Sequence, residues 1–136
     1  MTKYFANAAA LLICAALMAR IVPSSAAAAE PVTATEAQNG KDIVVDQGAS
    51  LVIVLESNPS TGYGWQVGKN NSAIMELAGP PRFHPAAHQM PGAAGHQLFT
   101  FGAILPGNDV IELEYLRPWE KGVAPVKTFS VGVTVK

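Results

Sequence analysis

The amino-acid sequence predicts an all-β sandwich of about seven strands. Short apolar segments are separated by turns rich in glycine and proline, and several of these segments alternate apolar and polar residues with a period of two. After residue 29 no stretch shows a long 3.6-residue period, and no repeat is found. The chain has 136 residues, which is enough for one domain with a single core.

The first 29 residues are predicted to be a secretory signal peptide. Lys3 supplies the positive charge, residues 8–19 form an apolar run, and a tract of small residues follows. The run is shorter than the ~20 residues that a membrane-spanning helix needs. We therefore expect cleavage near Ala26–Ala29 and an exported protein, periplasmic or secreted, that is not held in a membrane after cleavage.

The exported part is mildly acidic and lacks cysteine. Without Lys3 and Arg20 it keeps seven basic and ten acidic residues, a net charge of −3, with no basic stripe. Nucleic acid is therefore not an expected partner. The only cysteine, Cys14, leaves with the signal, and Ile13 before it does not fit a lipoprotein site. The domain is expected to have no disulfide.

The first half of the exported part contains a leader and three expected strands. Residues 30–40 are polar and are expected to form a flexible leader that ends in a turn. The strands are KDIVVD, SLVIVLES and GYGWQVG. In the second strand one face is expected to carry Leu51, Ile53 and Leu55. SAIMELAG fits either a strand or one helical turn, and residues 79–96 are expected to form a long irregular loop.

The second half contains three more expected strands. HQLFTFGAIL is followed by the turn sequence PGND, and KTFSVGVTV ends the chain. The strand DVIELEYLRP alternates strictly, which is typical of a half-exposed strand. The residues expected to face the core from the last two strands are Ile111, Leu113, Tyr115, Phe129, Val131, Val133 and Val135.

Neither nucleophilic catalysis nor phosphate binding is favoured by the motifs. Ser60 and Thr61 do not lie in a G-x-S-x-G elbow, and hydroxyls in a Pro/Gly loop usually bond to nearby backbone. The sequences GYG and GAAG lack the Lys-Ser/Thr ending of a phosphate-binding loop.

A metal site is the other chemical alternative. His84, His88 and His96 supply imidazoles that zinc prefers. Pro85 argues against a helix that would bring the first two together, and no carboxylate motif accompanies them. Solvated loop histidines are the favoured interpretation, and neither a metal nor a cofactor is expected.

Three loops between expected strands favour recognition of a partner. They are SNPSTGYGW, MPGAAGHQ and YLRPWEKG, and each contains proline and glycine that restrict or shape the backbone. Trp119 lies just past a strand and is expected to be exposed, whereas Trp65 is expected in the core and Tyr63 is expected to pack. For Arg117 the alternative to a binding role is a simple pairing with a neighbouring acid such as Glu114.

Taken together, the three loops resemble those of the chagasin family of cysteine peptidase inhibitors. NPSTGYGW resembles the family's N-P-T-T-G-Y/F loop, GAAG its G-x-G-G loop, and RPW its R-P-W loop. The order and approximate spacing agree, and the resemblance covers most of residues 40–136. The family has an immunoglobulin-like β-sandwich, so the resemblance implies such a domain over residues 41–136.

The resemblance also implies a mode of action. The three loops would enter the cleft of a papain-like peptidase and inhibit it tightly, reversibly and competitively. Ser60 and Thr61 would cover the catalytic cysteine and histidine, the middle loop would follow the non-primed side, and the third loop would hold the primed side. The implied contact residues are Asn58, Pro59, Ser60, Thr61, Gly62, Tyr63, Pro91, Gly92, Ala93, Ala94, Gly95, Arg117, Pro118 and Trp119.

Two positions depart from the family pattern. Ser60 replaces the commoner threonine and loses a methyl group, a cost of ~1 kcal/mol at most. Ala94 stands where the middle motif has glycine. If that position requires a positive φ, alanine adds ~1–2 kcal/mol of strain, and Ala94→Gly is expected to tighten binding.

Other functions remain open from the sequence. The domain is expected to be a monomer and not an enzyme. An exported binding module for a non-peptidase protein or a glycan would use the exposed Trp119 equally well. A metal-dependent enzyme built on the three histidines is the other alternative, and replacement of all three should leave inhibition intact if the inhibitor interpretation is correct.

Overall fold

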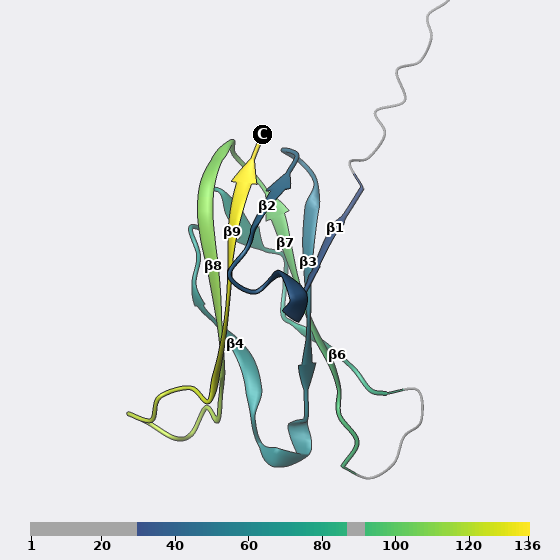
Figure 1. Cartoon of the computed structure of the whole chain (residues 1–136), viewed down its shortest axis with the longest axis vertical. Helices are drawn as coiled ribbons and strands as arrows, with labels where there is room; N and C mark the ends of the chain where they lie inside the picture. The colour runs from purple at the N-terminus through teal and green to yellow at the C-terminus, as the bar shows by residue number, and fades with distance from the viewer. Residues whose placement is uncertain (1–29, 87–91) are drawn as a thin grey trace, which may run out of the picture.

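A computed structural model describes residues 30–86 and 92–136 and confirms the all-β prediction (Figure 1). Two sheets pack face to face. One has the order β1-β3-β7-β5, with β6 also paired to β7, and the other has the order β2-β9-β8-β4. We call them the β3 sheet and the β8 sheet. The strands are β1 Val32–Thr35, β2 Asp42–Val45, β3 Ser50–Ser57, β4 Gly64–Lys69, β5 Met75–Leu77, β6 Arg82–His84, β7 Gly95–Ala103, β8 Gly107–Leu116 and β9 Lys127–Val135.

The core follows from the alternation of the long strands. Leu51, Ile53 and Leu55 of β3 are fully buried, as expected, and the side chains between them are only partly so. Every inward residue expected from β8 and β9 is buried. Two facing apolar sheets therefore form one core, which is the basic arrangement of a sandwich.

The expected flexible leader is instead part of the fold. Strand β1 pairs in parallel with β3, and Ala34 is fully buried. A 3₁₀ turn, η1 (Glu36–Gln38), then carries the chain to β2 in the other sheet, with Thr35 as its N-cap. The polar composition of 30–40 did not reveal this strand, because only one of its side chains is deeply buried.

The stretch 79–96 is also more regular than expected. Strand β6 pairs antiparallel with β7, so the two ends of this segment form a hairpin, and only part of the connecting loop is described. Strand β5 settles the ambiguity of SAIMELAG in favour of a strand. Together with β1, these short edge strands raise the count from about seven to nine.

The connections decide where the loops lie. Strand β8 already begins at Gly107, so the turn after β7 is made by residues 104–106 and not by PGND. At this turn the chain passes from the β3 sheet to the β8 sheet, as it also does earlier, between β3 and β4. Across residues 30–86 and 92–136, no helix has the length and apolar character needed to cross a membrane.

Candidate functional site

The three loops singled out in the sequence lie at one end of the sandwich, the lower end of Figure 1. The first loop, residues 58–63, connects β3 to β4 and so passes from one sheet to the other. The middle loop, residues 85–94, connects β6 to β7 within the β3 sheet. The third loop, residues 117–126, connects β8 to β9 within the β8 sheet. The two sheets thus each present a loop, with the first loop between them.

The first loop is a single capped 3₁₀ turn, η2 (Pro59–Thr61). Asn58 is its N-cap, and Oδ1 of Asn58 accepts hydrogen bonds from both the amide and the hydroxyl of Ser60. The hydroxyl of Thr61 donates to the carbonyl of Asn58 at 2.7 Å. Gly62 ends the turn with φ +82°, a conformation that favours glycine. Both hydroxyls are therefore bound within the loop, and the turn is exposed but rigid.

Aromatic side chains fasten the base of this loop to the sandwich. The amide of Asn58 donates to the hydroxyl of Tyr115 at 3.2 Å. Tyr63 stacks on Tyr115 with ring centroids 5.5 Å apart, and Trp65 lies on the same ring at 5.0 Å. The predicted packing of Tyr63 and burial of Trp65 are confirmed.

The middle loop is tied to the first loop through Asn58. Nδ2 of Asn58 donates to the carbonyl oxygen of Gly92 in the middle loop at 3.1 Å. Gly92 and Ala93 are exposed, whereas Gly95 is buried at the start of β7. Pro91 lies outside the described residues.

Strain at Ala94 was expected only if this position requires a positive φ, and that condition is not met. Among the described residues, only glycines have positive φ values, so Ala94 does not. The left-handed position in this loop is Gly92, with φ +81°. An alanine at 94 therefore fits the backbone without a conformational penalty.

Arg117 ties the third loop to the first. Its Nε donates to the carbonyl of Thr61 at 3.1 Å, and its guanidinium carbon lies 4.3 Å from the centre of the Tyr63 ring. Its Nη1 pairs with Glu120 at 3.0 Å. Arg117 therefore does pair with a neighbouring acid, but this acid is Glu120 of the same turn and not Glu114.

Trp119 is the most exposed large apolar side chain in the described part of the chain, at 64%. This confirms the predicted exposure. One edge of its indole lies against Gly62, where a Cβ would be 2.9 Å from Cζ2 of Trp119 and would overlap Cη2. The glycine is therefore required both for the backbone turn and for the position of the indole.

These contacts make the three loops one preorganised edge. Asn58 joins the first and middle loops, and Arg117 and Trp119 join the first and third. The sequence identified the loop residues but not these bonds, since they depend on how distant strands align. The one local signal was the capping pattern of Asn58 before Pro59 and Ser60, which indicates that the side chain of Asn58 is used in hydrogen bonds.

The loop edge does not support a catalytic activity of this protein. The Ser60 hydroxyl is held by Asn58, and the histidines of β6 and β7 lie on the sheet. No three His, Cys, Asp or Glu residues are grouped to hold a metal ion within residues 30–86 and 92–136. His88, one of the three histidines considered, lies outside these ranges.

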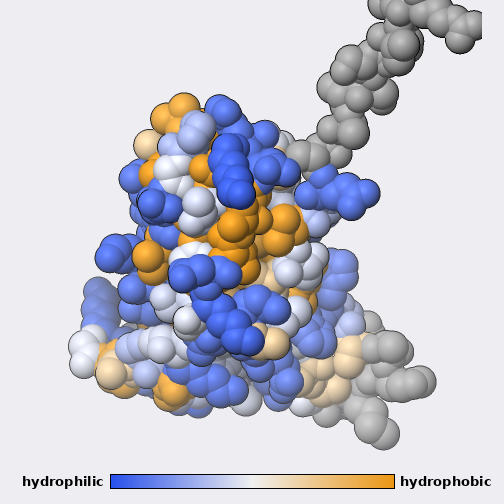
Figure 2. Space-filling model, turned by 45° about the horizontal axis from the view of Figure 1, so that its top comes forward, coloured by the Kyte–Doolittle hydropathy of each residue, from blue (hydrophilic) through white to orange (hydrophobic). Residues whose placement is uncertain are grey.

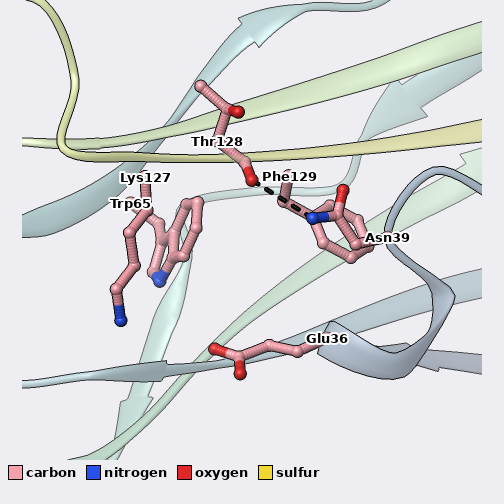
Figure 3. Close-up of a pocket in the computed structure, with 6 residues that line it drawn as sticks. All are labelled: Glu36, Asn39, Trp65, Lys127, Thr128 and Phe129. Carbon is pink, nitrogen blue, oxygen red and sulfur yellow. Dashed lines mark hydrogen bonds between the residues drawn. The ribbon is translucent and has the colours of Figure 1, made fainter.

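An open pocket of about 450 Å³ lies beside residues that closely follow the first and third loops, Trp65 of β4 and Lys127 of β9 (Figure 3). Trp65 and Phe129 contribute aromatic walls, and Lys127, Thr128, Asn39 and Glu36 surround them. None of the fourteen expected contact residues lines it.

Hydrophobic residues reach the surface in several places. Figure 2 shows them in a narrow strip along the middle of one face and in smaller groups toward the ends. In the third loop, Val123 and Val126 are more than half exposed alongside Trp119. These two valines were not among the expected contact residues, although their position within the loop could have identified them.

Comparison with known proteins places the chain in a family. The model of the chagasin family of peptidase inhibitors matches residues 44–133. Chagasin from Trypanosoma cruzi is 31% identical over 88 residues, which are 62% of this chain and 80% of chagasin.

Solved structures agree with the fold. The cysteine protease inhibitor EhICP2 from Entamoeba histolytica aligns with a TM-score of 0.71 and 24% identity, covering 79% of this chain and 96% of that one. PbICP-C, solved in complex with falcipain-2, aligns with a TM-score of 0.56 and 20% identity, covering 78% of this chain and 89% of that one.

Proposed function

This chain belongs to the chagasin family of cysteine peptidase inhibitors, and we propose that it blocks the active-site cleft of papain-like enzymes with its three cross-linked loops. Inhibition is tight, reversible and competitive. The observation that carries the proposal is the joining of three family-like motifs into one rigid edge through Asn58, Arg117 and Trp119. A preformed edge loses little conformational entropy on binding.

The roles that we propose for the loops are those that the family resemblance implies, and the chemistry of each loop supports them. Ser60 and Thr61 cover the catalytic cysteine and histidine of the enzyme, and the first loop is polar and lies between the other two. Gly92 and Ala93 of the middle loop expose backbone that pairs along the non-primed side. Trp119 supplies the apolar anchor on the primed side, as large aromatic residues commonly do at interfaces.

Nothing is cleaved in this arrangement. The Ser60 and Thr61 hydroxyls are bound to Asn58, so the turn keeps its own closed conformation and does not extend through the cleft as a substrate does. The first loop thus fills the cleft of the enzyme beside its catalytic cysteine without being cleaved.

We place the protein outside the cytoplasm, in the periplasm or the medium. The support is the signal-like sequence of the first 29 residues. One copy of the domain carries all three loops, so a monomer is sufficient for inhibition.

Titration of papain with the purified protein tests the function. Hydrolysis of a fluorogenic peptide is followed while inhibitor is added, and substrate concentration is varied to establish competition. Stoichiometric, reversible and competitive loss of activity is expected. Papain with its catalytic cysteine chemically blocked is a useful competitor, because it should relieve the inhibition.

Lack of inhibition of papain and of other papain-like enzymes at micromolar concentration would contradict the proposal. The alternative of an exported module for a non-peptidase ligand would then be favoured, with the exposed Trp119 as its anchor.

A further inference from the structure

Two of the histidines that appeared separate in the sequence face each other in the sheet. His84 of β6 and His96 of β7 are direct partners in the antiparallel register. Residues directly opposite each other project on the same face, with Cβ atoms about 4.5–5.5 Å apart. Both side chains are exposed, whereas Gly95 beside His96 is buried, so the pair lies on the outer face of the β3 sheet.

The carboxylate of Glu56 belongs to the same row of paired residues across β3, β7 and β6. Glu56 of β3 is the register partner of His96 on its other side, so His96 lies between Glu56 and His84. Glu56 is exposed. Glu36 of η1 borders the same shallow depression, about 180 Å³ in volume, as Glu56 and His96. Two carboxylates therefore lie close to His96, while the exposed Arg82 lies two residues before His84 on β6.

We propose that His84 and His96 form a two-imidazole site for a divalent transition-metal ion such as Zn²⁺. Neutral imidazole nitrogens bind Zn²⁺ at ~2.0–2.1 Å, and the spacing of a direct cross-strand pair allows two rings to reach one ion. Water completes the coordination. Glu56 serves as the carboxylate that accepts the second ring N–H of His96, the usual arrangement behind a metal-binding histidine.

The site lies at the neck of the middle-loop hairpin. Strand β6 has three residues and, among the described strands, pairs with β7 alone. An ion bound across the neck therefore links the two ends of that loop independently of the hydrogen bonds of the strands. This site does not depend on the proposed inhibition.

Zn²⁺ binding to the purified protein, produced without a polyhistidine tag, tests the proposal by isothermal titration calorimetry. We expect one ion per chain. His84→Ala and His96→Ala should each weaken binding at least tenfold. His88→Ala is the matched control, since it removes the third histidine of the chain, which is not a member of the pair, and should leave the affinity within twofold. Cu²⁺ should bind more tightly than Zn²⁺ at the same pair.

The resonances of the histidine rings supply a second measurement that does not depend on the variants. Zn²⁺ should shift the ring signals of His84 and His96 and leave those of His88 in place. Absence of binding at millimolar Zn²⁺, unchanged affinity in the two pair variants, or loss of binding in His88→Ala would each overturn the proposal.

Discussion

The contact between Gly62 and Trp119 predicts that a single methyl group uncouples the first and third loops. Gly62→Ala places a Cβ in the position of the indole edge and holds an alanine at φ +82°. The left-handed conformation costs ~1–2 kcal/mol. The ring must also move, and loss of an anchor worth ~2 kcal/mol corresponds to about 30-fold in affinity. We therefore expect the inhibition constant for papain to rise at least tenfold.

Gly48→Ala is the matched control for this experiment. Gly48 has nearly the same backbone angle, φ +85°, and no atom lies within 4 Å of the added Cβ. It precedes β3 at the end of the sandwich opposite the loops. Its strain of ~1–2 kcal/mol should lower Tm, by about 4–8 °C for each kcal/mol, but leave inhibition within twofold.

Fluorogenic papain titration and thermal unfolding of both variants separate the two effects. The reasoning would be refuted if Gly62→Ala inhibited papain as well as the parent protein. It would also be refuted if Gly48→Ala weakened inhibition to the same extent, because the loss would then reflect general strain.

Four further substitutions test the loop edge in the same assay. Trp119→Ala should weaken inhibition at least tenfold. Its Tm should change little, because the side chain is 64% exposed, and near-parental inhibition would show that Trp119 is not an anchor. Asn58→Asp keeps the cap acceptor but loses the donor to the middle loop, so a three- to tenfold weaker constant is expected from one lost hydrogen bond of ~1 kcal/mol, and no change would mean that the link is unimportant. Arg117→Lys keeps the charge but loses the planar stack and the Nε bond, and we expect several-fold weaker inhibition; equal inhibition would show that charge alone matters. Ala94→Gly should change the constant less than twofold, because the backbone there is unstrained; clear tightening would restore the earlier expectation.

The residues of the core and of the loops were predictable because their signals are local. Alternation in β3, β8 and β9 depends only on neighbouring residues, and so do the proline and glycine of the loops. The exposure of Trp119 followed from its place just beyond a strand. The sequence of β1 carried a weaker signal, since only Ala34 of this strand is deeply buried.

The contacts that join the loops were not predictable from local sequence. The bond from Asn58 to Gly92 spans 34 positions and that from Arg117 to Thr61 spans 56. Pairing of His84 with His96 likewise depends on the register of β6 against β7. Such contacts become visible only when the strands are aligned, as does the choice of Glu120 over Glu114 as the partner of Arg117.

The middle and third loops belong to different sheets, so the distance between them is a property of the packing between the sheets. Gln97 of the β3 sheet helps to set that packing, because its side-chain amide both accepts from the amide of Trp65 and donates to its carbonyl in the β8 sheet. A substitution in the interior can therefore widen or narrow the edge without altering any loop residue. Enzyme selectivity in this protein can evolve through its core, and variant libraries restricted to the loops would not sample that route.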